Sequence, residues 1–145
     1  MIKKILYPTD FSIEAKRALE FVKCLKNAGG KEVVVLHVID QRAVNDLSRF
    51  AMKDVDLILK DMQEKAGKEL VDIEKELKDN GYSVKIRVEK GDPFREILRV
   101  EGEEKASLIV VGSQGKADSF QTMLLGSVSY NLVRKSSCPV LVVKR

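Results

Sequence analysis

The stretch EVVVLHVID, residues 32–40, is an almost unbroken run of β-branched and apolar residues. A strand with one wet face alternates apolar and polar residues, whereas a strand of a parallel sheet is covered on both faces and reads as a continuous apolar run. A second run of the same kind, SLIVVGS, spans residues 107–113. The two runs together predict a parallel sheet with helices on both of its faces.

The residues before the first run divide into a strand and a helix. KKILYP, residues 3–8, is a short apolar run that stops at a proline, and residues 13–28 carry apolar side chains at helical spacing. Ser12 is placed to cap the start of this helix, and Gly29 or Gly30 to end it. This part of the chain therefore predicts a strand that leads directly into a helix.

A long amphipathic helix is predicted after the first run. Its apolar residues recur at steps of three to five and are Leu57, Met62, Ala66, Leu70, Ile73 and Leu77. The sequence DNGY, residues 79–82, ends this pattern. We expect a mobile or helical piece near residues 42–50 to precede the long helix.

The C-terminal half repeats the alternation of strands and helices. SVKIRVEKGD, residues 83–92, places Val84, Ile86 and Val88 on one face, which is typical of a strand toward a sheet edge. Two helices are predicted over PFREILRVEGEEKA (93–106) and SVSYNLVRKS (127–136), and a last strand over CPVLVVKR (138–145). With no linker and no repeat, this order predicts one doubly wound α/β domain over residues 1–145.

Composition and charge narrow the class of protein. The 145 residues are 44% hydrophobic and 33% charged, which is the balance of a folded globular chain. The net charge of +4 comes from basic residues interleaved with acidic ones, so it does not indicate a nucleic-acid partner. Cys24 and Cys138 stand far apart, which indicates neither zinc nor a disulfide framework and fits a reducing cytoplasm. We find no signal peptide and no membrane-spanning run, and expect a cytoplasmic protein.

Three strand ends are expected to form a ligand site. In open α/β sheets, ligands bind outside the carboxyl ends of the strands, where the strand order reverses. The segments at those ends are PTD (8–10), HVID (37–40) and GSQG (112–115). Neither G-x-G-x-x-G after the first strand nor G-x-x-x-x-G-K-[ST] is present, so we expect neither a dinucleotide-dependent dehydrogenase nor a P-loop ATPase.

The segment GSQGKADSFQTMLLGS, residues 112–127, resembles a motif of the universal stress protein family. The ATP-binding members of that family carry G-x2-G-x9-G-[ST] between the fourth strand and the last helix, and here ten residues separate Gly115 from Gly126. The resemblance extends over KKILYPTDFSIEAKRAL, VVVLHVID, LIVVGSQGK and LLGSVSYNLVRKSSCPVLVV, which is nearly the whole chain. It implies a Rossmann-like fold of five parallel strands in the order 3-2-1-4-5.

The glycines and the start of the last helix are the candidate phosphate contacts. Gly112 and Gly115 lack side chains, so their backbone N–H groups can approach phosphate or ribose oxygens closely; an ordinary turn is the alternative. Gly126, Ser127 and Val128 open a helix whose free N–H groups and positive dipole end suit a phosphate. Ser127 alternatively serves only as a helix cap.

The remaining site residues follow from the resemblance. It implies that Asp10 faces the adenosine moiety, with Pro8 and Thr9 beside it, and that Val38 contacts adenine. The alternatives are a helix-starting aspartate and a buried core valine. The single histidine, His37, lies inside an apolar strand and is interpreted as structural, so no nucleophile–base pair and no catalytic residue is assigned. No residue is assigned to metal either: Mg²⁺ or Mn²⁺ would be held through the phosphates.

These observations favour a nucleotide-binding stress-response regulator. ATP, or AMP or ADP, would bind in the cleft and change the shape of residues 41–80 for a protein partner, as a switch. Two alternatives stay open: a slow ATPase or phosphoryl-transfer enzyme, and a dimeric interaction module that binds no nucleotide. The last strand, about residues 139–143, is apolar although it should lie at a sheet edge, which predicts pairing in a homodimer.

Overall fold

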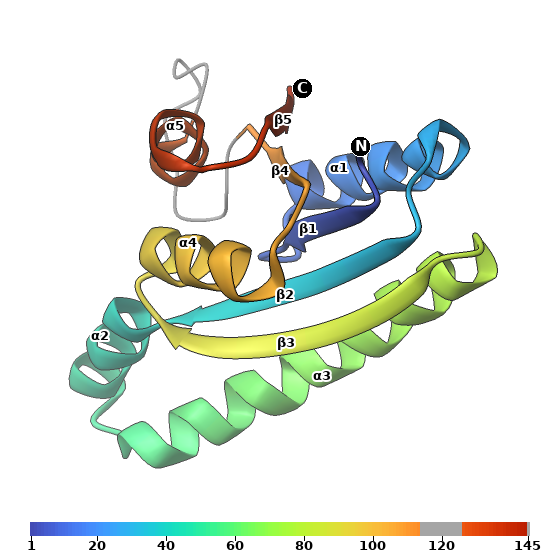
Figure 1. Cartoon of the computed structure of the whole chain (residues 1–145). Helices are drawn as coiled ribbons and strands as arrows, with labels where there is room; N and C mark the ends of the chain where they lie inside the picture. The colour runs from blue at the N-terminus through green and yellow to red at the C-terminus, as the bar shows by residue number, and fades with distance from the viewer. Residues whose placement is uncertain (114–125, 145) are drawn as a thin grey trace.

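The computed structural model describes residues 1–113 and 126–144, and within them a parallel sheet has the strand order β3-β2-β1-β4-β5 (Figure 1). The strands are β1 (Lys4–Pro8), β2 (Glu32–Asp40), β3 (Ser83–Gly91), β4 (Leu108–Gly112) and β5 (Val140–Val143). This confirms the predicted fold class and strand order, and it places β3 and β5 at the two edges. The order reverses beside β1, where the chain passes from one half of the sheet to the other.

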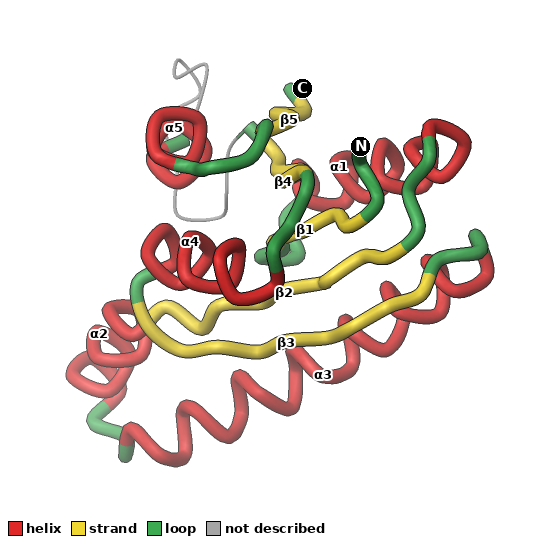
Figure 2. Tube along the Cα trace, in the orientation of Figure 1, coloured by secondary structure: helices red, strands yellow, loops and turns green. Residues whose placement is uncertain are grey.

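Helices cover both faces of the sheet, as predicted (Figures 1 and 2). They are α1 (Ile13–Cys24) with a following 3₁₀ turn η1 (Leu25–Ala28), α2 (Gln41–Ala51), α3 (Val55–Asp79), α4 (Pro93–Glu104) and α5 (Ser127–Lys135). Residues of α1 and α3 pack in one apolar cluster, and residues of α4 and α5 in another. The helical alternative for the piece near residues 42–50 is therefore the correct one.

The packing of β2 explains its unbroken apolar run. Val33 and Val35 belong to the cluster that contains α1 and α3, while Val34 and Leu36 belong to the cluster that contains α4 and α5. All four are completely buried. Successive side chains of a strand point to opposite faces, and both faces here are covered, so each position has to be apolar.

The helix limits follow their local signals. The hydroxyl of Ser12 accepts a hydrogen bond from the backbone N–H of Ala15 at 3.1 Å, which is the predicted cap of α1. Gly29 ends η1 with a φ of 108°, a left-handed conformation that favours glycine. Asp40, Asp54 and Asp92 likewise cap α2, α3 and α4 with their side chains.

The apolar stripe of α3 is confirmed except at its first residue. Ala66, Leu70, Ile73 and Leu77 are buried, but Leu57 is 64% exposed and its neighbour Ile58 is buried instead. Ile58 packs with Ile39 and Val44 in a small third cluster beneath α2. Val88 of β3 is also 40% exposed, because β3 is an edge strand with a neighbouring strand on one side only.

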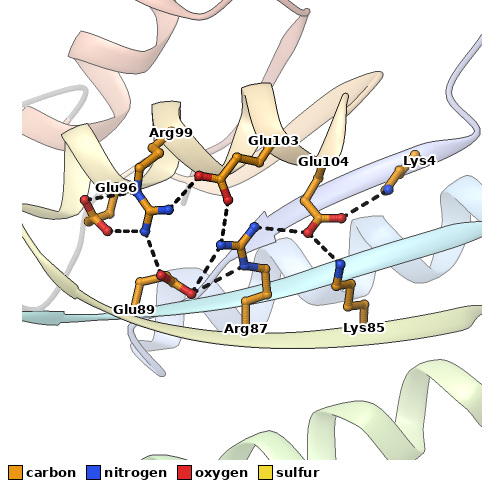
Figure 3. Close-up of polar contacts among 8 residues, drawn as sticks. All are labelled: Lys4, Lys85, Arg87, Glu89, Glu96, Arg99, Glu103 and Glu104. Atoms are coloured by element: carbon orange, nitrogen blue, oxygen red, sulfur yellow. Dashed lines mark hydrogen bonds and ion pairs between the residues drawn. The ribbon is translucent and has the colours of Figure 1, made fainter.

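An ion-pair network ties α4 to β1 and β3 (Figure 3). Glu104 contacts Lys85 at 2.8 Å, Arg87 at 3.0 Å and Lys4 at 3.1 Å. The remaining members are Glu89, Glu96, Arg99 and Glu103. These contacts join α4 to the sheet, and the first turn of α4 forms part of the site described next.

Candidate functional site

A cavity of about 630 Å³ lies along the carboxyl ends of the strands. It is lined by the end of β1 and the turn after it, the ends of β2 and β4, and the first turns of α2, α4 and α5. Seven of the residues predicted for the site line it: Pro8, Thr9, Asp10, Val38, Gly112, Ser127 and Val128. The three strand ends that are scattered in the sequence therefore converge, as predicted.

The cavity is lined by both apolar and polar residues. Leu36, Val38, Ile97, Val111 and Phe94 supply apolar surface from β2, α4 and β4. Charged groups stand at the end that lies over β2 and β3. There the Arg42 guanidinium lies 3.8 Å from the Asp40 carboxylate and 3.7 Å from that of Asp92. A site with this distribution accepts a ligand that has a flat apolar part and a polar part.

The β1–α1 turn, residues 9–12, is held by hydrogen bonds within itself. The Thr9 hydroxyl accepts from the N–H of Phe11 at 3.1 Å, and the Asp10 carboxylate accepts from the N–H of Ser12 at 3.0 Å. Phe11 adopts a φ of 64°, a left-handed conformation that costs a non-glycine residue about 1–2 kcal/mol. The turn keeps this conformation because its neighbours hold it, and it presents Asp10 to the cavity.

Tyr7 anchors the start of α1 beneath the cavity. Its hydroxyl donates to the backbone carbonyl of Ala15, a cavity-lining residue, at 2.5 Å. Burial raises the pKa of Tyr7 to about 12, so the phenol stays neutral and keeps donating at physiological pH. The first turn of α1 is thereby fixed against the end of β1.

The start of α5 closes the other end of the cavity. Gly126 occupies the cap position, and its N–H donates to the carbonyl of Ser113. In contrast to the starts of α1 to α4, no side chain of the described residues caps this helix. The first N–H groups of a helix have no partner within the helix, so those of Ser127 and Val128 are directed as an anion site would require.

Gly112 has a packing reason to be glycine. A Cβ at this position would lie 2.8 Å from the backbone carbonyl carbon of Glu14, in the first turn of α1. Its φ is not in the left-handed range. The missing side chain therefore lets β4 and α1 approach each other, whatever binds in the cavity. Gly115 lies outside the described residues.

Sequence reasoning missed the contributions of α2 and α4. Arg42, Ala43, Asp92 and Phe94 line the cavity but stand outside the motif segments. Asp92 was detectable, because it follows the third predicted strand and directly precedes a proline at a predicted helix start. Among the described residues, no three side chains of the metal-ligating types gather into a possible metal site. No described helix is long and apolar enough to cross a membrane.

Comparison with known proteins gives consistent matches over the whole chain. The model of the universal stress protein family matches residues 1–144. The chain is 40% identical, over 157 aligned residues, to universal stress protein MJ0577 of Methanocaldococcus jannaschii, covering 100% of this chain and 96% of that protein. The solved structure of the MJ0577 protein superposes with a TM-score of 0.90 at 42% identity, covering 100% of this chain and 97% of that one.

Two more distant solved structures share the fold and contain nucleotides. One is a universal stress protein in complex with cAMP, with a TM-score of 0.70 at 23% identity, covering 97% of this chain and 96% of that one. The other is the Arabidopsis thaliana family protein At3g01520 with AMP bound, with a TM-score of 0.65 at 21% identity, covering 99% of this chain and 92% of that one. At identities of 23% and 21%, these two similarities show a shared fold and nothing more.

Proposed function

The chain belongs to the universal stress protein family, and from this premise we propose that it is a cytoplasmic stress-response regulator that binds an adenine nucleotide, ATP foremost, in the cavity. One observation carries the proposal: the first residues of α5 line a cavity of about 630 Å³ whose lining is partly apolar. An adenine ring suits the apolar part of the lining, and phosphates suit N–H groups at a helix start, which have no partner within the helix. Two proteins of the same fold contain cAMP and AMP, which supports this ligand class.

Each predicted residue that the structure describes then has a role in the proposed complex. The phosphates lie at Gly126, Ser127 and Val128, where the helix dipole and the Ser127 hydroxyl meet them. Asp10, as an acceptor-only carboxylate, takes hydrogen bonds from the ribose hydroxyls. Val38 lies against the base, while Pro8, Thr9 and Gly112 complete the wall. Mg²⁺ or Mn²⁺, when present, is held by the phosphate oxygens rather than by a protein cage.

A charge placed at the start of α5 tests the position of the phosphates. Ser127→Glu should weaken ATP binding at least tenfold, because the new carboxylate repels the phosphates. The fold should not suffer, since Ser127 is exposed and an acidic residue in a first helical turn favours the helix. Ser127→Gln is the matched control of equal size. Calorimetric titration of both variants measures their affinity for ATP and for adenosine, which has no phosphates. Equal ATP affinity in the two variants would contradict the phosphate assignment.

The resident ligand and the enzymatic alternative are tested on the wild-type protein. Mass spectrometry of the nucleotide released on denaturation identifies what copurifies with the chain. Phosphate release from ATP that persists in the wild type and disappears in Ser127→Glu would favour the slow ATPase. A chain that neither copurifies with nor binds ATP or AMP would favour the interaction module that binds no nucleotide.

The regulatory part of the proposal rests on α2. Arg42 and Ala43 belong to α2 and line the cavity, so a bound nucleotide touches the segment 41–80 that joins β2 to β3. A ligand that contacts this segment differently in two states shifts the balance between them. ATP should therefore change amide hydrogen exchange across α2 and the start of α3. Exchange that changes only around the strand ends would contradict the switch.

We infer that the protein forms a homodimer through β5, which lies at an edge of the sheet. The carbonyl of Pro139 accepts from Ile109 of β4, and that of Val143 accepts from Ser113 just after β4. The backbone groups of Val140 and Val142 therefore point to the free edge. Val142→Pro removes one outward N–H and leaves the contacts with β4. It should shift the mass in solution from dimer to monomer, while Val143→Ala, on the inward side, should not. A wild-type monomer would refute the inference.

A further inference from the structure

His37 reaches the turn beside the cavity from the opposite face of the sheet. The odd-numbered residues of β2, Val33 and Val35, pack on the side of α1 and α3, whereas the cavity-lining Leu36 and Val38 lie on the side of α4. His37 shares the face of Val33 and Val35, and it is not among the residues that line the cavity. It therefore has no direct contact with anything bound there.

The imidazole of His37 instead holds the β1–α1 turn. Its Nδ1 lies 2.8 Å from the backbone carbonyl oxygen of Thr9, and its ring lies against that of Phe11 with centroids 4.5 Å apart and planes at 30°. A carbonyl only accepts hydrogen bonds, so Nδ1 carries the proton in this contact. Thr9 is 5% exposed, and water cannot readily replace the imidazole as its partner.

Both contacts act on the residues that flank Asp10. Thr9 precedes it, and Phe11, with its left-handed backbone, follows it. Phe11 also packs against the cluster of α1 and α3. The Asp10 carboxylate thus stands between two residues that the same imidazole fixes. Residues held in an unfavourable backbone conformation keep it only where the surroundings determine it, and here His37 is such a determinant.

We propose that His37 is a positioning residue of the nucleotide site, which holds the Thr9–Phe11 turn so that Asp10 is already placed for the ligand. The proposal rests on the nucleotide-binding function proposed above. When only a fraction of molecules has the binding geometry, the apparent affinity falls by that fraction. Loss of the contact should therefore weaken binding even though His37 never touches the ligand.

The test uses two substitutions of His37 and a control substitution that lowers stability elsewhere in the core. His37→Leu removes the donor and should weaken ATP and AMP binding about tenfold. His37→Asn offers an amide N–H near the position of Nδ1 and should stay within about threefold of the wild type. Ile73→Val removes a methyl group from the core on the same side of the sheet, outside the cavity lining; it should lower stability and leave the affinity unchanged.

The single histidine permits a measurement that needs no variant. Nitrogen-15 spectra of the wild type should show one imidazole with a proton on Nδ1, and its signals should shift when ATP is added. An imidazole that lacks the Nδ1 proton would overturn the proposal. So would a His37→Leu protein that binds ATP as tightly as the wild type. In that case the nucleotide-binding function itself would stand, whereas a wild type that binds neither nucleotide would refute both.

Discussion

Replacing Glu104 by glutamine is expected to weaken the fold most at neutral pH. The side chain of Glu104 is only 6% exposed, and its carboxylate lies within 3.1 Å of cationic groups on Lys85, Arg87 and Lys4 (Figure 3). The hydrogen-bonded ion pair with Lys85, supported by those with Lys4 and Arg87, lowers the pKa of Glu104 to about 2. Glutamine keeps the shape of the side chain and leaves the cations facing a neutral amide.

The size of the effect follows from that pKa. A carboxyl group whose pKa is about 4.3 in the unfolded chain and about 2 in the folded one favours folding by about 3 kcal/mol when ionised. Lys85 is 53% exposed, so solvent screens its ion pair, and the expected loss is about 2 kcal/mol. Because the folded pKa is the lower one, this stabilisation is complete above the unfolded pKa. It disappears as the pH falls from about 5 to about 2.

Urea unfolding followed by circular dichroism at about pH 7, 5 and 3 measures this difference directly. The free energy of unfolding of Glu104→Gln should lie below that of the wild type at neutral pH, and the two values should approach each other at pH 3. Glu103→Gln is the matched control, because the adjacent Glu103 also pairs with arginines but is well exposed, and its effect should be much smaller. A difference that is absent, or that is the same at every pH, would refute the reasoning.

Three further predictions concern packing and burial. Gly112→Ala should cost about 1–3 kcal/mol in urea unfolding, because the new Cβ meets backbone of α1 at 2.8 Å; an unchanged midpoint would contradict this. Gly67→Ala should instead raise the free energy of unfolding by about 0.5–1 kcal/mol, since Gly67 lies inside α3 with open space at its Cβ, and any loss of stability would count against that account. Tyr7 and Tyr82, whose pKa values burial raises to about 12, should titrate late in ultraviolet absorbance. For both tyrosines the pKa is higher in the folded than in the unfolded chain. Their contribution to the free energy of unfolding should therefore be fully present below about pH 10 and should be lost as the pH rises toward 12.

Where sequence reasoning succeeded, a local pattern and its tertiary surroundings required the same residue. The run from Val33 to Leu36 is apolar because both faces of β2 are covered, and that pattern by itself predicted a parallel sheet. Ser12 caps α1 through a bond to a residue three positions away, which is a contact that spacing alone determines. The strand order was also predicted correctly, but that prediction came from the resemblance to the family and not from the periodicity of the sequence.

Sequence reasoning failed where the local pattern was compatible with two answers and only the tertiary packing distinguished them. Leu57 and Ile58 are both apolar, and the helical period does not decide which of them faces the core; the contact with Ile39 and Val44 selects Ile58. At Gly112, a phosphate contact and a close approach of two backbones both predict glycine. Only the position of Glu14 shows that packing already requires it.

The sequence by itself determined the fold class, the order of the elements, and the strand ends at which a ligand site should form. These features depend on short-range patterns and on a general rule for parallel sheets. The tertiary structure alone decided that α2 and α4 share the cavity, and that His37 supports the turn next to Asp10 from the opposite face. Such contacts join residues far apart in the chain, as His37 and Thr9 are, and no local pattern encodes them.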